Sequence, residues 1–324
     1  MPAAKRFLSA LGLIARVWVA AATPGGGPED FDHAAREGRS IVLARADGAR
    51  IRLTPYGEGI LRVQAARGGE EFFGDDHDAM VEPRAWGGEL ALAEGATSLD
   101  IRIAGEGLLT LGVRKHPLNL TFREHAPGGI EERTLLAEEG GVRWMSDTIS
   151  ESFRCDPGEH FTGLGHGFFG RSGGIDLAGR TAERNYGTAH GNQAPLIVPF
   201  YISSRGYGVF LHSTFPNSFS FGHEGLYGFS IRGAGRMDFF VIAGPSPADV
   251  IGRYTQLTGR PRFPPLAAFG LGLSDKGNDE RSPDPSDERW WKRKVAAHRA
   301  AGFPLDHLIN DNRWRAGGGK RCES

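Results

Sequence analysis

The chain has 324 residues, 40% of them hydrophobic, which leaves room for two domains with sizeable cores. Its formal net charge is −1, so nothing in the charge balance favours nucleic acid or an anionic membrane as a partner. The 48 glycines and 19 prolines indicate many turns, and hence a body rich in β-structure.

The N-terminal segment, residues 1–24, resembles an export signal. Lys5 and Arg6 precede an apolar run over 7–14, and Ala20–Ala22 offers a small-residue cleavage site. The apolar run is too short to span a bilayer as a stop-transfer helix. The segment therefore predicts a periplasmic or secreted protein. The alternative is a disordered start on a cytoplasmic protein.

From Ser40 onward, short apolar segments alternate with turns, as in an antiparallel sheet. The segments 41–43 and 51–53 flank Asp47-Gly48, a pair that favours a tight hairpin turn. Further strands are predicted over 60–63, 99–103, 108–113, 197–202, 208–211, 229–231 and 237–243. Together these segments predict an antiparallel β-sandwich over residues 30–255.

Two sequence features resemble ligand sites, and we interpret both as structural. The carboxylates of Asp75, Asp76 and Asp78 lack the glycine and the distal glutamate of a calcium-binding EF-hand loop, so a solvated loop is expected. The stretch Gly163–Gly167 lacks the third glycine and the following helix of a dinucleotide-binding loop. Its glycines are expected to permit tight turns and close backbone approach. We therefore expect no metal and no cofactor.

The two cysteines, Cys155 and Cys322, form neither a disulfide framework nor a zinc-binding spacing. Two unrelated thiols are the simpler interpretation, and a bridge between them stays open. Three phenylalanines, Phe215, Phe219 and Phe221, alternate as residues on one sheet face do. We interpret them as core residues rather than as an aromatic platform for a sugar.

A short helix over 249–257 is expected to link the sandwich to the C-terminal part of the chain. That part is expected to continue as strand, helix and strand. An apolar strand is predicted over 269–273, buried on both faces, and a helix opens at Asp284-Pro285. Gly302 and Pro304 end that helix, and a second strand follows over 307–309. Such a unit is the building block of α/β folds.

Several stretches carry a resemblance to a known family. They are Phe161–Gly165, Pro199–Leu211, Ala243–Pro261, Pro264–Leu266 and Pro304–Asp306. In this order they resemble glycoside hydrolase family 31, which contains α-glucosidases, α-xylosidases and α-galactosidases. The resemblance covers the chain from Arg50 to its end. It implies a mainly β fold, with a galactose-mutarotase-like sandwich followed over 261–324 by the truncated start of a (β/α)8 TIM barrel.

The resemblance also implies residues that bind sugar. Asp311 matches the family carboxylate that holds sugar hydroxyls, and Trp314 is expected to pack against an apolar sugar face. A loop over 181–194 is expected to reach the barrel mouth with Asn185, near a place where many members carry an aspartate. Arg313 stands where many members have a second acid, which leaves the identity of the sugar open. Asp306 is expected to have a structural role.

Hydrolysis with retention requires two carboxyl groups about 5–5.5 Å apart. The resemblance implies that both lie on later barrel strands, beyond Ser324, so no complete active site is expected in this chain. The chain is therefore predicted to be the N-terminal portion of a retaining α-glycoside hydrolase. A noncatalytic carbohydrate-binding sandwich and a structural domain without ligand are the alternatives. The oligomeric state stays open.

Overall fold

The computed structural model describes residues 30–74, 80–103, 109–125, 132–165, 176–184, 197–223, 225–275 and 288–310. The chain divides into two compact units between Gly259 and Arg260, and each is described by itself. The predicted export signal, the carboxylates at 75–78 and Cys322 lie outside the described residues. Cys155, the other cysteine, is half-buried on the loop after β11 (Thr148–Arg154).

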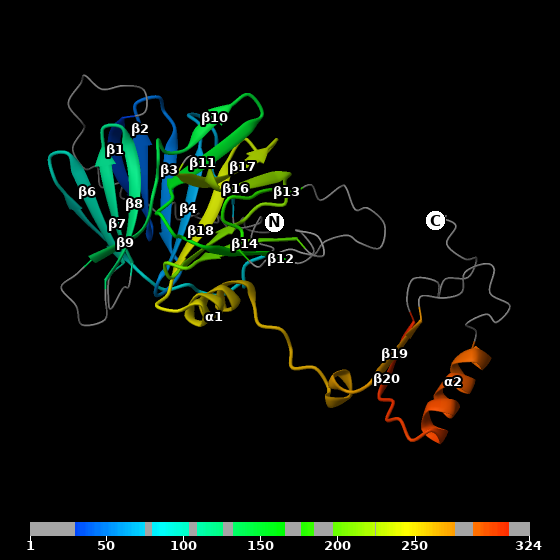
Figure 1. The fold of residues 1–324 in the computed structure, drawn as a ribbon. Coiled ribbons are helices and arrows are strands. Elements are labelled where there is room, and N and C mark those ends of the chain that lie inside the picture. The colour runs from blue at the N-terminus through cyan, green and yellow to red at the C-terminus, as the bar shows by residue number, and fades with distance from the viewer. Residues whose placement is uncertain are drawn as a thin grey trace, which may run out of the picture. The chain divides into compact units, whose positions relative to one another are not determined.

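The first unit contains three antiparallel sheets in its described part (Figure 1). The largest has eight strands, in the order β1 (Phe31–Glu37), β2 (Ser40–Arg45), β3 (Arg50–Pro55), β4 (Ile60–Ala66), β18 (Met237–Ala243), β15 (Tyr207–Leu211), β14 (Ile197–Ser203) and β12 (Phe161–Gly165). A five-stranded sheet has the order β10 (Arg143–Met145), β11 (Thr148–Arg154), β17 (Leu226–Arg232), β16 (Asn217–His223) and β13 (Thr181–Arg184). The other has the order β5 (Leu90–Glu94), β6 (Ser98–Ile103), β7 (Leu109–Lys115), β8 (Leu118–His125) and β9 (Glu132–Ala137).

The predicted hairpin around Asp47-Gly48 joins β2 to β3. Leu43 pairs with Ile51, and Gly48 adopts φ +82°, a backbone conformation that glycine enters without steric cost. The carboxylate of Asp47 accepts a hydrogen bond from the backbone N–H of Ala49 at 3.0 Å, which closes the turn. The other strands predicted upstream of residue 244 are also present, although most extend by one to three residues. The chain is mainly β and antiparallel, as predicted.

The core of the first unit lies between the sheets. One hydrophobic cluster combines side chains of all three sheets, among them Val63, Leu111 and Phe229. Phe219 and Phe221 are fully buried in it, as predicted. Phe215 is 39% exposed, so its prediction as a core residue is wrong. It lies before the start of β16, where the alternation of sheet faces does not apply.

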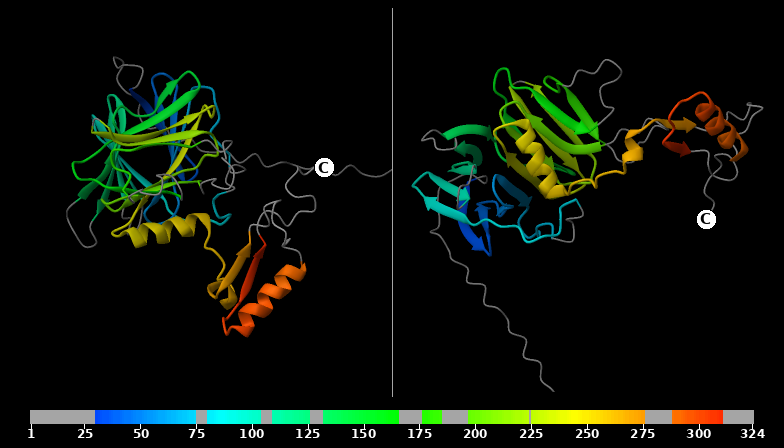
Figure 2. Two further views of the ribbon diagram at one scale, coloured as in Figure 1. Left: turned by 45° about the vertical axis from the view of Figure 1, so that its right-hand side comes forward. Right: turned by 90° about the horizontal axis from the view of Figure 1, so that it is seen from below.

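Helix α1 (Pro247–Thr258) follows β18 and covers part of the outer face of the eight-stranded sheet (Figure 2). Its side chains Val250 and Leu257 are buried with Phe200, Phe210 and Phe240 of that sheet. The helix begins earlier than predicted because the hydroxyl of its N-cap, Ser246, accepts from a backbone N–H of the first turn, and proline suits that turn.

The second unit contains a short 3-10 helix (Leu266–Phe269), β19 (Gly272–Asp275), α2 (Glu288–Ala300) and β20 (His307–Asn310) in its described part. β19 and β20 are parallel, with Leu273 opposite Leu308. Two backbone hydrogen bonds end α2, Gly302 N–H to Arg299 at 3.1 Å and Phe303 N–H to His298 at 3.0 Å. This is the Schellman pattern, and it confirms Gly302 as the helix stop.

The first predicted strand of this unit is displaced. Residues 266–269 form the 3-10 helix, so the strand begins at Gly272 rather than at Phe269. Phe269 is 65% exposed and Leu271 45%, so burial on both faces is also wrong for the described residues. The 3-10 turn is favoured because Pro265 supplies an extended N-cap and the Ala267 carbonyl accepts from Gly270 N–H.

Candidate functional site

The three residues predicted to bind sugar, Asn185, Asp311 and Trp314, lie outside the described residues, as does Arg313. Asp306 is described. Its backbone N–H donates to the Leu271 carbonyl at 2.9 Å, and its carboxylate accepts from the Leu271 N–H at 3.1 Å. Asp306 thus fixes the backbone that leads into β19, which agrees with the structural role expected for it.

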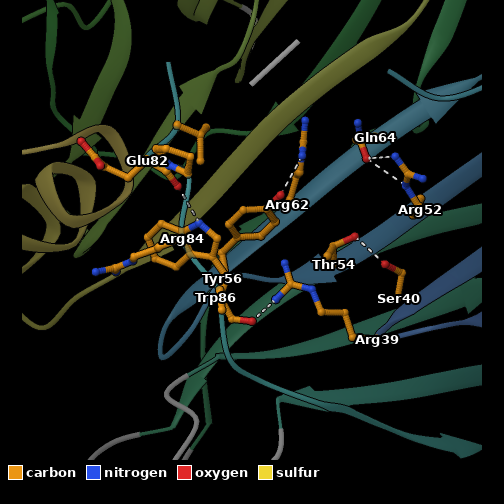
Figure 3. A pocket seen from close by; sticks show the side chains of 13 residues that line it. Arg39, Ser40, Arg52, Thr54, Tyr56, Arg62, Gln64, Glu82, Arg84 and Trp86 are labelled. Carbon is orange, nitrogen blue, oxygen red and sulfur yellow. Dashed lines mark hydrogen bonds between the residues drawn. The ribbon is translucent and has the colours of Figure 1, made fainter. Parts of the chain in front are cut away.

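The described residues form a pocket on the outer face of the eight-stranded sheet, with a volume of about 530 Å³ (Figure 3). Its floor is made by side chains of β2, β3 and β4, and one wall by the segment 81–86. The residues that line it are Arg39, Ser40, Arg52, Thr54, Tyr56, Arg62, Gln64, Val81, Glu82, Pro83, Arg84, Ala85 and Trp86. Ligand sites typically occupy roughly 300–1,000 Å³, so the pocket has a suitable size.

A hydrogen-bonded network fixes the floor of the pocket. The guanidinium of Arg62 donates to the carboxylate of Asp238 at 3.0 and 2.7 Å and to the Tyr56 hydroxyl at 2.7 Å. Gln64 also donates to Asp238, at 3.1 Å, and accepts from Arg52 at 2.9 Å. Because these groups fix one another, the floor is rigid before any ligand arrives.

The electrostatics of the floor depend on Asp238. Burial by itself would raise the pKa of this carboxyl. The charge of Arg62 and the hydrogen bonds from His212 and Arg62 outweigh burial, so the pKa lies below its usual value. Asp238 is therefore ionised at neutral pH and balances the charge of Arg62. Ser40 and Thr54, both buried, complete the floor with hydroxyls 2.8 Å apart.

The walls combine aromatic rings with arginines. The rings of Tyr56 and Trp86 lie 5.4 Å apart, centre to centre. Arg39 lies 4.9 Å above the Tyr56 ring and donates to the Trp86 carbonyl at 2.5 Å. Arg84 lies 3.8 Å from the centre of the Trp86 ring. These cation–π contacts hold the rings and the guanidinium groups in defined positions around the opening.

Sequence reasoning missed this pocket. Arg52, Thr54, Arg62 and Gln64 alternate with apolar residues along β3 and β4, and such a pattern normally indicates a solvated sheet face. The signal that was available is the presence of Arg50 and Arg52 on β3 and of Arg62 on β4. The enclosing segment 81–86 contains Pro83 and Trp86 but no periodic pattern.

Two carboxyl side chains, Glu138 and Glu151, are buried inside the sandwich. Burial raises the pKa of Glu138 to about 8, against the lowering effects of the Leu120 backbone N–H and of Arg45. Burial, and next the charge of Glu138, raise the pKa of Glu151 well above its ordinary value. Both carboxyls are 2% exposed or less, so they are interior groups that favour the neutral form.

Among the described residues, no three His, Cys, Asp or Glu side chains gather where a metal ion could be held. The helices of the described part also include none that is long and apolar enough to cross a membrane.

Comparisons with known proteins match the sandwich. Residues 50–219 match the N-terminal galactose mutarotase-like domain of glycosyl hydrolase 31. Alpha-xylosidase XylQ of Lactiplantibacillus pentosus is 38% identical over 190 residues, which are 57% of this chain and 23% of that protein. Alpha-glucosidase 2 of Bacillus thermoamyloliquefaciens is 27% identical over 248 residues, 72% of this chain and 28% of that protein. The chain thus spans about a quarter of the length of these relatives.

Solved structures show the same fold. A Flavobacterium johnsoniae dextranase of this group, complexed with isomaltotriose, has a TM-score of 0.74 and 22% identity, over 89% of this chain and 34% of that one. An alpha-xylosidase from a soil metagenome, complexed with xylose, has a TM-score of 0.70 and 18% identity, over 87% of this chain and 42% of that one.

Proposed function

We propose, on the premise that this chain belongs to glycoside hydrolase family 31, that it is the N-terminal portion of a retaining α-glycoside hydrolase. The observation that carries the proposal is the match of residues 50–219 to the N-terminal galactose mutarotase-like domain of glycosyl hydrolase 31, together with coverage of only 23% of the related xylosidase. In this proposal the sandwich occupies 30–255, and the unit over 261–324 begins a (β/α)8 barrel.

The connection of the strands in the second unit is the evidence for the proposed barrel. β19 and β20 are parallel neighbours separated by α2, which is the connection that a barrel repeats eight times. In such barrels, residues that act on substrate follow the C-terminal ends of strands. Asp311 comes directly after β20, which ends at Asn310. We propose that Asp311 binds sugar hydroxyls, that Trp314 packs against the sugar ring and that Asn185 donates to a hydroxyl.

The nucleophile and the acid/base are proposed to lie on barrel strands that follow β20. Two carboxyl groups about 5–5.5 Å apart would then cleave the glycosidic bond with retention of configuration. The substrates of the relatives differ, as the names xylosidase, glucosidase and dextranase show. The proposal is therefore limited to the class of α-glycosides.

A hydrolysis assay tests the proposal. Residues 1–324 and the longest product of the same reading frame are compared on nitrophenyl α-xyloside and α-glucoside. Hydrolysis with retention by the longer product, and none by residues 1–324, is expected. Turnover by residues 1–324 alone, or inversion by the longer product, would contradict it. Asp311→Asn in the longer product should lower kcat/KM strongly, whereas Glu288→Gln, an exposed carboxylate on α2, should leave it unchanged.

A sandwich that binds carbohydrate without hydrolysis is the second candidate. The observation that favours it is the pocket of Figure 3, which combines ring surfaces with hydroxyl and amide groups, the side chains that sugars contact. Sugar affinity of residues 1–324 in the absence of any hydrolysis by the longer product would support this candidate.

A further inference from the structure

Another pocket of the sandwich, the edge pocket, lies along the edge of a strand. Its volume is about 670 Å³. Residues 142–145 line one side of it, and the β2–β3 turn and the two residues after β4 line the other. Because successive side chains of a strand point to opposite faces, a pocket lined by four consecutive residues faces the strand edge. The strand is β10, the terminal strand of its sheet in the described part of the chain (Figure 1).

The backbone of Trp144 is free to pair with another strand on the pocket side. A two-residue turn joins Met145 to its partner Thr148, which makes these two a hydrogen-bonded pair of the hairpin. Bonded and non-bonded pairs alternate, so the N–H and C=O of Trp144 point away from β11. The Val142 carbonyl points the same way, because Arg45 across the pocket donates to it at 3.1 Å. No backbone group of the described residues pairs with Trp144 on that side.

Two cations flank this free edge. Arg67 and Arg143 are exposed, and neither guanidinium forms an ion pair or a hydrogen bond with another described residue. The charge of Arg143 lowers the pKa of the buried Glu151, but burial outweighs that effect, so the carboxyl favours its neutral form. The charges of Arg45 and Asp47 offset each other in an ion pair at 2.6 Å. The edge pocket therefore carries a net positive charge, which favours an anionic partner.

Apolar surface lies beside these cations. β10 places Arg143 and Met145 on one face of the sheet and Trp144 on the other. Met145 is 63% exposed, and the indole of Trp144 is partly buried and donates to the Gly235 carbonyl at 2.9 Å. An extended peptide with alternating acidic and apolar side chains matches this arrangement, because each kind then lies on one face. A bare anion would use the arginines alone and leave the Trp144 backbone without a partner.

We propose that the free edge of β10 binds an extended acidic segment of a partner protein, which adds a strand to the sheet beside Trp144. The backbone of this segment pairs with the N–H and C=O of Trp144, and its carboxylates lie at Arg67 and Arg143. The site goes beyond the proposed function, since it requires neither a sugar nor the barrel. The two proposals can therefore fail independently.

Fluorescence anisotropy with the full chain tests it. The probe is a fluorescein-labelled, amidated peptide of the sequence Glu-Val-Glu-Val-Glu, which places its carboxylates on one face and its valines on the other. Saturable binding is expected, and added salt should weaken it. Methylation of both valine N–H groups removes the donors that face Trp144 and should weaken binding about tenfold or more. The peptide Lys-Val-Lys-Val-Lys should not bind.

Variants of the chain place the site. Arg143→Gln and Arg67→Gln should each weaken binding of the acidic peptide about tenfold, the loss expected for one charge-assisted hydrogen bond. Arg114→Gln makes the same charge change on an exposed residue of β7, in another sheet, and should have no effect. Thermal unfolding of the three variants verifies that they fold.

The proposal is overturned if the acidic peptide does not bind, if the lysine or the methylated peptide binds as tightly, or if Arg143→Gln and Arg114→Gln behave alike. Two further outcomes would assign the edge to another occupant and also overturn it. Binding to residues 1–324 but not to the longest product of the same reading frame would show that a later segment of the chain covers β10. Self-association of the unliganded chain that Arg143→Gln abolishes would show that a second copy does.

Discussion

Arg62 on β4 and Asp238 on β18 form a two-point ion pair, with N–O distances of 3.0 and 2.7 Å, although 176 positions separate them in the chain. Their side chains are 2% and 1% exposed. The pair lies between adjacent strands of the eight-stranded sheet, where Phe240 is opposite Arg62 and Gln64 is opposite Asp238. It thus joins the N-terminal hairpins to the last strand of the sandwich and supports the floor of the pocket.

Removal of one partner of this pair should strongly destabilise the sandwich. Asp238→Ala leaves the Arg62 guanidinium buried without its counter-charge, and we expect a loss of about 3–5 kcal/mol in the free energy of unfolding. Urea denaturation measures it. The double variant Arg62→Met, Asp238→Leu should recover most of the loss, because it removes both charges. Arg154→Ala breaks an exposed pair with Glu139 and should cost at most about 1 kcal/mol. An equal cost for Asp238→Ala and Arg154→Ala would show that burial of the pair does not matter.

Stability should depend on pH through the interior carboxyls. The folded-state pKa of Glu138 is about 8, against an ordinary value of 4.5, so the folded state holds a proton that the unfolded state releases. The free energy of unfolding should therefore fall as pH rises from about 4.5 to 8. Each unit of pKa difference corresponds to about 1.4 kcal/mol, so the fall can reach several kcal/mol.

Glu138→Gln should flatten this pH dependence and stabilise the protein at pH 8, because an amide retains the shape of the protonated acid. Glu139→Gln, at the exposed neighbour, should leave the slope unchanged. Urea midpoints at several pH values provide the measurement. A slope that is the same in wild type and Glu138→Gln would assign the pH dependence to other groups.

Asp238 should contribute a slope of opposite sign at acid pH. Its folded-state pKa lies below the ordinary value of 3.8, so its stabilisation is present above that value and is lost as pH falls through the folded pKa. Acid unfolding below about pH 4 should therefore be less steep in Asp238→Asn than in wild type. Circular dichroism during acid titration measures the slope. Equal slopes in the two proteins would contradict the ion pair.

Two glycine-to-alanine substitutions should change the stability of the sandwich in opposite directions. Gly163 on β12 has φ +136°, and a Cβ there would overlap the Phe200 carbonyl and come within 2.7 Å of the Tyr201 Cα. Gly163→Ala should therefore cost more than about 2 kcal/mol. Gly252 in α1 has open space around it, and Gly252→Ala should stabilise by about 0.5–1 kcal/mol. Thermal unfolding of both variants is the measurement, and effects of the same sign would refute this distinction.

The two units should differ in resistance to proteolysis. Described residues of α2 include none that is buried, and Phe263, Leu266 and Phe269 are exposed, whereas the sandwich has an extensive core. A parallel pair with one helix also leaves strand edges uncovered. Limited digestion, followed by mass spectrometry, should release fragments of 261–324 before any of 30–255. Equal resistance of the two segments would contradict this expectation.

Local sequence signals predicted several of the strands and one helix end. The hairpin at Asp47-Gly48, the apolar run of β18 and the stop of α2 at Gly302 each depend on residues close in the chain. Other strands were missed, among them β8 and β11, whose buried residues alternate with less buried ones. β5 has one buried residue of five and β10 has three residues in all, so neither carries a recognisable alternation.

The role of the glycines in β12 was predictable from the sequence, but the strand that they approach was not. Their interpretation as places of close backbone approach is confirmed at Gly163, which the neighbouring strand β14 crowds. The identity of that neighbour was not predictable, since Gly163 pairs with Tyr201 across a long stretch of chain. The sugar-binding prediction for Asn185, Asp311 and Trp314 stays a prediction, because it depends on the family resemblance and lies outside the described residues.

The sequence by itself determined the β-rich body, most of its strong strands and the family, because side-chain alternation, turn residues and family motifs are properties of short stretches of chain. Only the tertiary structure decided that β4 pairs with β18, that Arg62 meets Asp238, and that the polar outer face of β3 and β4 becomes a pocket beneath Trp86. The physical reason is that alternation specifies which residues share a face of a strand. The partner of each strand, and the segment that covers a face, depend on the free energy of packing the whole chain.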